Sequence, residues 1–318
     1  MKKIPIGVDD FKKLIENNAL YIDKTKFIIE LLDDAAEVKL FTRPRRFGKT
    51  LNMSTLKYFF DIKNANENRK LFNGLDIEKS VYISEQGKYP VIFISMKGIK
   101  TKDWEHCLYD LKGLIGDLYN EFEYIREILN ESELNTFNEI WLKEDIAEYK
   151  NALKNLTSFL YKYYKKEVIL LIDEYDTPLI TAYKYGYYDE ALPFFKVFYG
   201  EALKTNPYLK MGIMTGIIRV IKTGIFSDLN NLSVYSILND FYSDFFGFTQ
   251  DEVKKALSLA KEKQEYNALI SLTEERALEK AKEKIKQNEK NNNNNYNIMT
   301  NYKKGIEILN ANIHEIIL

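Results

Sequence analysis

The stretch R-P-R-R-F-G-K-T-L at residues 43–51 determines how the rest of the sequence is interpreted. It follows a short apolar run, V-K-L-F-T at 38–42, and leads into a segment with helical apolar spacing at 50–60. The tripeptide Gly-Lys-Thr at 48–50 therefore lies where a predicted strand turns into a predicted helix. A tight glycine turn, a lysine and a hydroxyl at a helix N-terminus are the parts of a phosphate-binding loop. The match to G-x-x-x-x-G-K-[ST] is incomplete, because Arg43 replaces the first glycine.

Composition limits the classes of protein to consider. The 318 residues are 45% hydrophobic and 29% charged, which indicates a globular chain with one large or two ordinary domains. Its 46 basic and 47 acidic side chains nearly cancel, so a general basic coat for nucleic acid is excluded. The single cysteine, Cys107, cannot form an intramolecular disulfide. With no signal peptide and no apolar run near the roughly 18 residues of a membrane span, we expect a cytoplasmic location and no membrane insertion.

Short apolar runs alternate with longer helical patterns along the chain, which predicts an α/β fold with a mainly parallel central sheet. Because the runs are continuously apolar, the strands should be covered on both faces. The predicted strands are 38–42, 90–95, 168–172 and 209–215. The predicted helices are 50–60, 104–128, 145–164 and 191–203.

We expect one domain at 1–250, with inserted helices at about 101–166, followed by a polar helical tail at 251–318. The tail should begin at a capping box, Thr249-Gln250-Asp251-Glu252. An asparagine-rich run at 290–297 is interpreted as a linker.

The third predicted strand ends in Leu-Ile-Asp-Glu, which has the form of a Walker B element. Asp173 could hold a Mg²⁺ ion there, and Glu174 could polarise an attacking water. The alternative is that both residues only begin a solvated loop. Asp176 could orient an arginine or a water, or it could serve the turn before Pro178.

The fourth predicted strand places Thr215 and, shortly after it, Arg219 at the carboxyl edge of the sheet, where ligands of open α/β folds bind. Thr215 could sense a terminal phosphate, and Arg219 could stabilise transferred charge. The alternatives are an ordinary strand end and a surface ion pair.

Six blocks of sequence occur in order and together resemble the predicted AAA-ATPase-like family of bacteria. They are YIDKT at 21–25, RPRRFGKTLNMSTL at 43–56, VILLIDEYDTPL at 168–179, TGIIRV at 215–220, FSDLNNL at 226–232 and FGFTQDEV at 246–253. The resemblance implies a three-layer P-loop NTPase fold. Family members typically read R-R-F-G-K-[ST], so Arg43 in place of the first glycine is a family trait.

The resemblance also implies roles for individual residues. Lys49 would contact phosphate, Thr50 and Asp173 would hold Mg²⁺, and Glu174 and Arg219 would be catalytic. The remaining nucleotide-binding positions would be Arg45, Arg46, Phe47, Gly48, Leu51 and Thr215. For Arg45 and Arg46, a surface basic patch is the alternative.

We therefore expect an ATP-binding protein, with a Mg²⁺-dependent ATPase as the first interpretation. A non-hydrolysing nucleotide-dependent interaction module and a truncated inactive family member are the alternatives. The family is often fused to a PD-(D/E)xK nuclease-like domain, but residues 256–318 lack a strand-flanked Asp and a following Glu-x-Lys. No nuclease activity is expected, a nucleic-acid partner has no support, and a protein partner or homo-oligomer stays open.

Overall fold

The computed structural model describes residues 5, 7–142, 149–218 and 230–259, with only the backbone described for 255–259. Contacts divide the chain into two compact units, each described here by itself. Unit 1 consists of Met1–Phe27, Pro44–Thr55 and Tyr242–Leu318, and unit 2 consists of Ile28–Arg43 and Leu56–Phe241. The predicted Asn-rich linker and most of the predicted tail lie outside the described residues.

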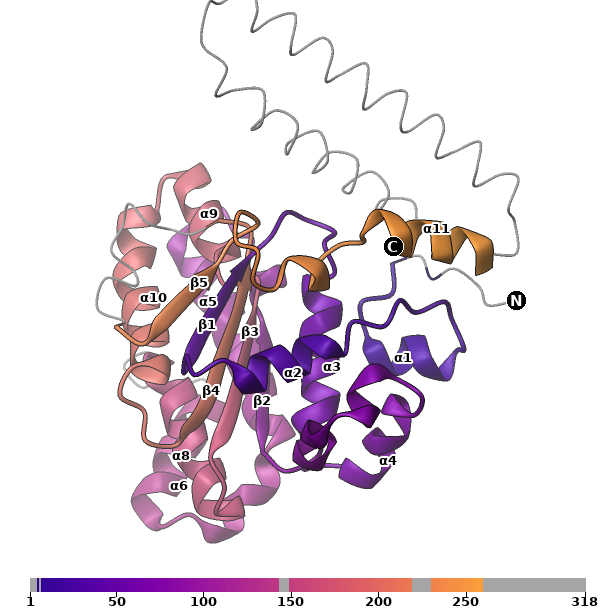
Figure 1. The fold of residues 1–318 in the computed structure, drawn as a ribbon. Helices are drawn as coiled ribbons and strands as arrows, with labels where there is room; N and C mark the ends of the chain where they lie inside the picture. The colour runs from indigo at the N-terminus through magenta and orange to yellow at the C-terminus, as the bar shows by residue number, and fades with distance from the viewer. Residues whose placement is uncertain (1–4, 6, 143–148, 219–229, 260–318) are drawn as a thin grey trace, which may run out of the picture. The chain divides into compact units, whose positions relative to one another are not determined.

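Unit 2 contains a five-stranded sheet in the order β2-β3-β4-β1-β5, and all of its strand pairs are parallel (Figure 1). The strands are β1 Val38–Thr42, β2 Val91–Ser95, β3 Val168–Asp173, β4 Leu209–Gly216 and β5 Leu232–Tyr235. All residues of β1 and β3 are buried, as expected for apolar strands covered on both faces. The prediction of an α/β fold with a parallel sheet is thereby confirmed. The edge strand β5 was missed, because its four partly exposed residues form no apolar run.

The direction of travel across the sheet explains why both faces are covered. From β1 the chain passes to β2 at the far edge, and it then returns through β3 to β4 beside β1. Crossovers between parallel strands are right-handed, so connections that run in opposite directions place their helices on opposite faces. In such sheets ligands bind outside the carboxyl ends of the strands, near the point where the order reverses.

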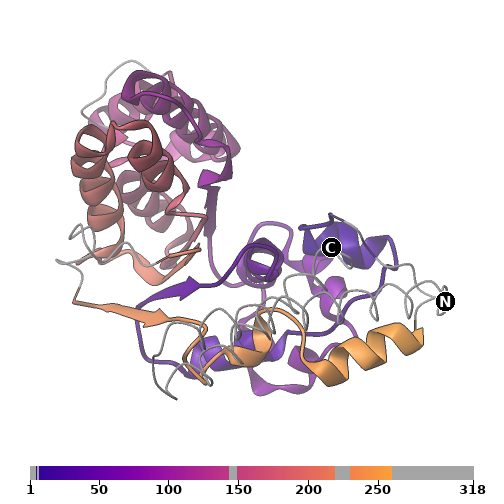
Figure 2. The same cartoon turned by 90° about the horizontal axis from the view of Figure 1, so that it is seen from above.

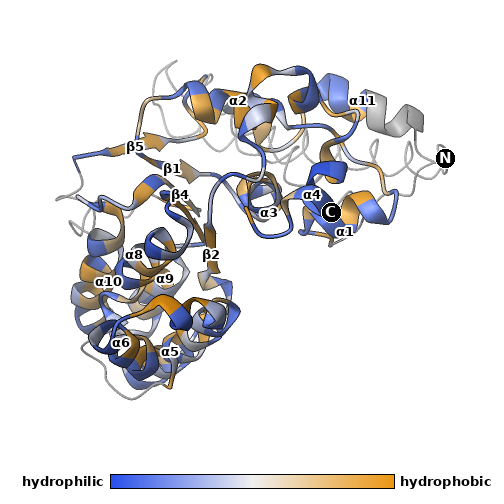
Figure 3. Cartoon of the chain, turned by 90° about the horizontal axis from the view of Figure 1, so that it is seen from below, coloured by the Kyte–Doolittle hydropathy of each residue, from blue (hydrophilic) through white to orange (hydrophobic). Residues whose placement is uncertain are grey.

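The helices that follow β2 and β3 gather on one side of the strands (Figure 2). They are α5 Trp104–Glu121, α6 Glu131–Trp141, α8 Ala152–Tyr164, α9 Thr177–Tyr185 and α10 Tyr188–Leu203. Their apolar residues form one core with strand residues such as Leu40, Leu170 and Met214. In Figure 3 these helices alternate between hydrophilic and hydrophobic colours, which is typical of amphipathic helices on a buried sheet.

Two predicted helices differ from the observed ones. The predicted helix at 104–128 ends at Glu121, and a 3₁₀ helix, Glu123–Ile128, follows it. Phe122 leaves the helical conformation between them, with φ −112° and ψ 19°, and is buried in the core. Helix α8 begins at Ala152 instead of 145, and residues 143–148 lie outside the described part of the chain.

The opposite face of the sheet is covered by elements that follow β1. Helix α3, Lys49–Phe60, begins in unit 1 and ends in unit 2, where the short helix α4, Ala65–Arg69, follows. The Lys57 ammonium lies 5.6 Å from the centre of the Phe93 ring on β2, which places the end of α3 over this face. Within this layer Phe59 packs edge-on against Phe60 and Phe72.

Unit 1 combines N-terminal, loop and C-terminal segments. It contains α1, Phe11–Glu16, the start of α2, Lys26–Asp33, the first turns of α3, the 3₁₀ helix η6, Ser243–Phe245, and α11, Gln250–Leu259. The predicted capping box of α11 is confirmed: the Glu252 amide donates to the Thr249 hydroxyl (3.3 Å), and the Thr249 amide donates to the Glu252 carboxylate (2.8 Å).

Candidate nucleotide-binding site

The loop before α3 has an unusual backbone. Arg46 and Gly48 both have positive φ, 67° and 72°, whereas Phe47 between them does not. Alternation between the two hands of the backbone makes successive N–H groups converge, and such concavities bind anions. A positive φ costs a non-glycine residue about 1–2 kcal/mol, so the loop holds Arg46 in a strained backbone conformation.

Lys49 is the first residue of α3 and is only 6% exposed. Its ammonium donates to the Pro44 carbonyl (2.8 Å), so the side chain spans the loop from its last residue back to its beginning. Thr50 lies in the first helical turn and is partly exposed. The first amides of a helix have no intrahelical acceptor, and together with the helix dipole they attract phosphate.

The other predicted loop residues differ in burial. Arg45 and Arg46 are exposed, as both the phosphate-contact and the surface-patch interpretations allow. Phe47 is buried, and its carbonyl accepts a hydrogen bond from the Gly247 amide (3.1 Å). Leu51 is partly exposed and lines a small cavity together with Phe47 and Gly48.

Arg43, which replaces the first glycine of the general motif, has a structural position in unit 2. It is 1% exposed, and its guanidinium donates to the carbonyls of Thr42 (3.0 Å) and Tyr235 (2.7 Å). Its amide donates to the Gly216 carbonyl, which extends the β1–β4 ladder. Burial lowers the pKa of Arg43 to about 10. The side chain therefore fastens β5 to the end of β1.

The carboxyl edge of the sheet brings Asp173 and Thr215 together. Asp173 is fully buried at the end of β3. Its carboxylate accepts hydrogen bonds from the Thr215 hydroxyl and, at 3.4 Å, from the Ser95 hydroxyl. Ser95 is paired with Asp173 in the β2–β3 register, so its place follows from the strand alignment. Sequence reasoning missed Ser95, because nothing within the β2 run specifies its neighbour.

Glu174 follows Asp173 and has a left-handed backbone with φ 51°. Its amide donates to the Thr215 hydroxyl (3.3 Å), and its carboxylate accepts from the Thr177 hydroxyl (3.0 Å) at the start of α9. The side chain is partly exposed, unlike that of Asp173. Within unit 2, Ser95, Asp173, Glu174 and Thr215 thus form what we call the strand-edge cluster.

Asp176 is fully buried, and its role was left open by the sequence. One carboxylate oxygen accepts hydrogen bonds from the amides of Ile217 (2.7 Å) and Ile218 (2.9 Å). The neighbouring Tyr175 hydroxyl donates to the Ile218 carbonyl (2.8 Å). Asp176 and Tyr175 therefore hold the start of the segment after β4. Arg219, predicted to be catalytic, lies outside the described residues.

The donor set is compatible with Mg²⁺. Within the described ranges no three His, Cys, Asp or Glu side chains are gathered as a metal site. Mg²⁺ is usually held by one or two carboxylates together with substrate phosphates and water, and not by an all-protein cage. Within unit 2, the buried Asp173 with the Ser95 and Thr215 hydroxyls beside it fits that chemistry.

The parallel sheet, the phosphate-type loop after β1 and the acidic end of β3 define a P-loop NTPase-like protein. The family model described as "Predicted AAA-ATPase" matches residues 5–226, and the chain belongs to this family. Membership indicates a nucleotide-binding P-loop protein.

Among curated proteins, the chain is similar to an "Uncharacterized protein in vnfD 5'region" from Azotobacter chroococcum mcd 1. The two are 28% identical over 254 residues, which cover 79% of this chain and 44% of the relative. The chain thus spans less than half of that relative's length. No solved structure gives a significant match. No helix in the described part of the chain combines the length and apolarity needed to cross a bilayer.

Proposed function

We propose that this chain binds ATP with Mg²⁺ and hydrolyses it. The observation that carries the proposal is the loop at Arg46–Thr50, in which two positive φ angles precede the N-terminus of a 12-residue helix. A backbone of this shape next to a helix N-terminus is typical of anion-binding loops, which supports the proposal. Lys49 would contact the terminal phosphates, and the neighbouring arginines would add positive charge.

Hydrolysis is assigned to the strand-edge cluster. Mg²⁺ bound with ATP would neutralise charge on the phosphates. Asp173 would hold the ion, with its carboxylate oriented by the Thr215 and Ser95 hydroxyls. Glu174 would accept a hydrogen bond from the attacking water, and Thr177 fixes the direction of its carboxylate.

Thermal unfolding with and without Mg-ATP tests the binding step. A ligand that binds only the folded chain stabilises it by about 2.7 kcal/mol at a hundred times its Kd. The unmodified protein should show this shift. Lys49→Ala should abolish it, because the ammonium group that would contact the phosphates is lost. Lys12→Ala is the matched control, since Lys12 pairs, in the described part of the chain, with the exposed Glu16 one helical turn away on α1 (3.8 Å). An equal Mg-ATP shift in Lys49→Ala would contradict the assignment.

Phosphate release tests the hydrolysis step. A positioned general base contributes roughly 10²–10⁴-fold, so Glu174→Gln should lower turnover by at least about 100-fold while ATP still binds. Glu201→Gln, which removes a half-exposed partner of Lys154 on α10, should leave turnover unchanged. If Glu174→Gln binds ATP and releases phosphate at the unmodified rate, the hydrolytic role of Glu174 is wrong. Tight binding without turnover by the unmodified chain would favour a nucleotide-dependent interaction module.

A further inference from the structure

Residues 242–253, here called the strap, are bonded to the phosphate-type loop within unit 1. The Asn52 side-chain amide, on the second turn of α3, donates to the Phe245 carbonyl (2.9 Å). The Gly247 amide donates to the Phe47 carbonyl (3.1 Å). Phe47 is flanked by the two positive-φ residues of the loop. The strap therefore contacts the loop backbone at Phe47, between the two residues with positive φ.

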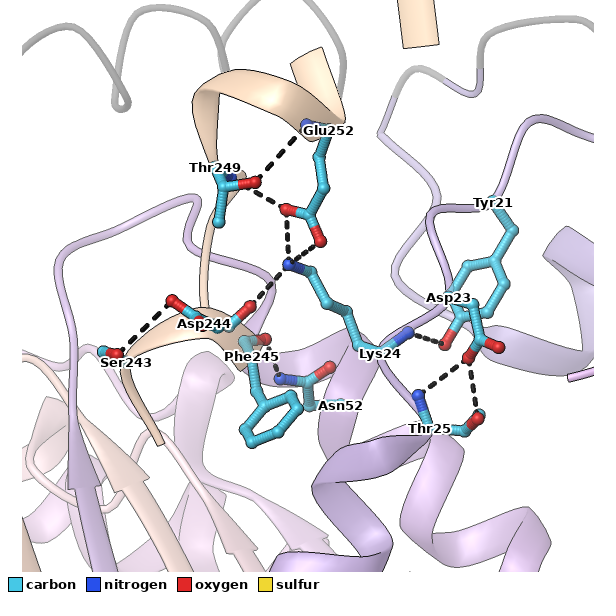
Figure 4. A network of polar contacts seen from close by, with 10 residues as sticks. All are labelled: Tyr21, Asp23, Lys24, Thr25, Asn52, Ser243, Asp244, Phe245, Thr249 and Glu252. Atoms are coloured by element: carbon cyan, nitrogen blue, oxygen red, sulfur yellow. Dashed lines mark hydrogen bonds and ion pairs between the residues drawn. The ribbon is translucent and has the colours of Figure 1, made fainter. Parts of the chain in front are cut away.

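A buried lysine fastens the strap to the N-terminal segment. Lys24 is 8% exposed, and its ammonium lies 2.6 Å from both carboxylate oxygens of Glu252 and 2.5 Å from the Asp244 carbonyl (Figure 4). Burial lowers the pKa of Lys24, and the Glu252 carboxylate opposes that shift. Removing one partner of a buried pair is costly because the other charge stays desolvated.

Glu252 connects this ion pair to the start of α11. The same carboxylate that receives the Lys24 ammonium also accepts the Thr249 amide of the capping box. Glu252 thus both caps the N-terminus of α11 and pairs with Lys24. If the strap leaves Lys24, the helix start loses part of its ordering.

Aromatic packing completes the attachment. The Phe27 ring lies 5.4–5.7 Å, centre to centre, from the rings of Tyr242, Phe245 and Phe246. A cavity of about 40 Å³ is lined by residues of the strap, of the loop and of the N-terminal segment, among them Phe248, Leu51 and Tyr21. The three segments therefore form one small cluster around the loop.

We propose that the strap couples nucleotide occupancy of the loop to the ordering of α11, so that this helix reports whether ATP is bound. The inference rests on the proposed function. Nucleotide binding that stabilises the loop and the start of α3 would also stabilise the hydrogen bonds that join Phe47 and Asn52 to the strap. By linkage, the docked strap must favour nucleotide by the same factor.

Amide hydrogen exchange and nucleotide titration of the full chain test the coupling. In the unmodified chain, Mg-ATP should slow exchange of residues 244–254 about fivefold or more, the lower end of typical allosteric coupling. Glu252→Gln removes the charge but keeps a capping-box residue, since glutamine serves at that position. It should weaken Mg-ATP affinity about fivefold or more, as should Lys24→Met.

Asp251→Asn is the matched control, because among the described residues Asp251 pairs with the exposed Lys254 on the same helix (3.4 Å). It should bind Mg-ATP as the unmodified chain does. Unchanged exchange in the strap, together with unchanged affinity in Glu252→Gln, would overturn the coupling and leave the proposed function standing. Failure of the unmodified chain to bind Mg-ATP would overturn both. Exchange in β3 serves as the check that each variant is folded.

Discussion

At the scale of single residues, burial decides what a charged side chain does. Arg43, Arg45 and Arg46 are nearly adjacent in the sequence, yet of these three only Arg43 is buried. Its guanidinium donates hydrogen bonds to two backbone carbonyls instead of facing solvent. Lys24 and Asp176 are likewise buried and hydrogen-bonded. A buried polar group must be paired, because its desolvation is otherwise uncompensated.

Asp61, which follows the end of α3, gives a pH-dependent prediction. Burial raises its pKa to about 6, although the Lys63 amide and the charges of Lys57 and Lys63 oppose the shift. The unfolded chain should titrate near 3.9, so the folded chain binds more protons between about pH 4 and 6 and loses stability as pH rises. Asp61→Asn should therefore stabilise the protein by about 1–3 kcal/mol at pH 7.5 and much less at pH 4.5.

Urea unfolding at these two pH values measures the difference. Asp110→Asn, at an exposed position on α5, is the control and should show little change at either pH. A gain from Asp61→Asn that does not depend on pH would show that titration of Asp61 is not its cause.

At the scale of elements, the end of β4 is a close fit against the segment after β3. A Cβ added at Gly216 would lie 2.6 Å from Cε1 of Tyr175 and 2.9 Å from Cγ of Asp176. Neither neighbour can move easily, because the Tyr175 hydroxyl and the Asp176 carboxylate are both bonded to the chain after β4. Gly216→Ala should destabilise the protein by about 1–3 kcal/mol, the usual cost of overpacking.

Chemical unfolding measures this effect, and Gly200→Ala provides the contrast. Gly200 lies within α10, and a Cβ there would meet nothing within 4 Å. Alanine should stabilise that helix by about 0.5–1 kcal/mol. Equal effects of the two substitutions on the free energy of unfolding would show that the close contacts at Gly216 do not destabilise the Gly216→Ala variant.

At the scale of the whole molecule, the donor set predicts how metal and nucleotide depend on each other. Because the described residues offer no multi-carboxylate metal site, Mg²⁺ should bind mainly through ATP phosphates. Mg²⁺ alone should leave the melting temperature unchanged, and EDTA should remove most of the shift that Mg-ATP produces. A full shift with Mg²⁺ alone would point to a protein cage and contradict the proposal that ATP phosphates supply most of the metal ligands.

The parallel α/β sheet, the position of the phosphate-type loop and the acidic end of β3 could all be predicted from the sequence. These features depend on apolar periodicity and on residues close together in the chain, so local reasoning can find them. The capping box of α11 was found for the same reason, since Thr249 and Glu252 are three residues apart. Strand β5 was missed because its pairing with β1, and not its own composition, makes it a strand.

The contacts between residues far apart in the sequence became visible with the folded chain. Arg43 bonds to a carbonyl 192 residues away, Asp176 to an amide 41 residues away, and Lys24 to a carboxylate 228 residues away. No local pattern encodes such partners, because each depends on where the folded chain brings its segments together. For the same reason, Arg43 stood out in the sequence as a missing glycine, whereas the fold shows that it joins two strands.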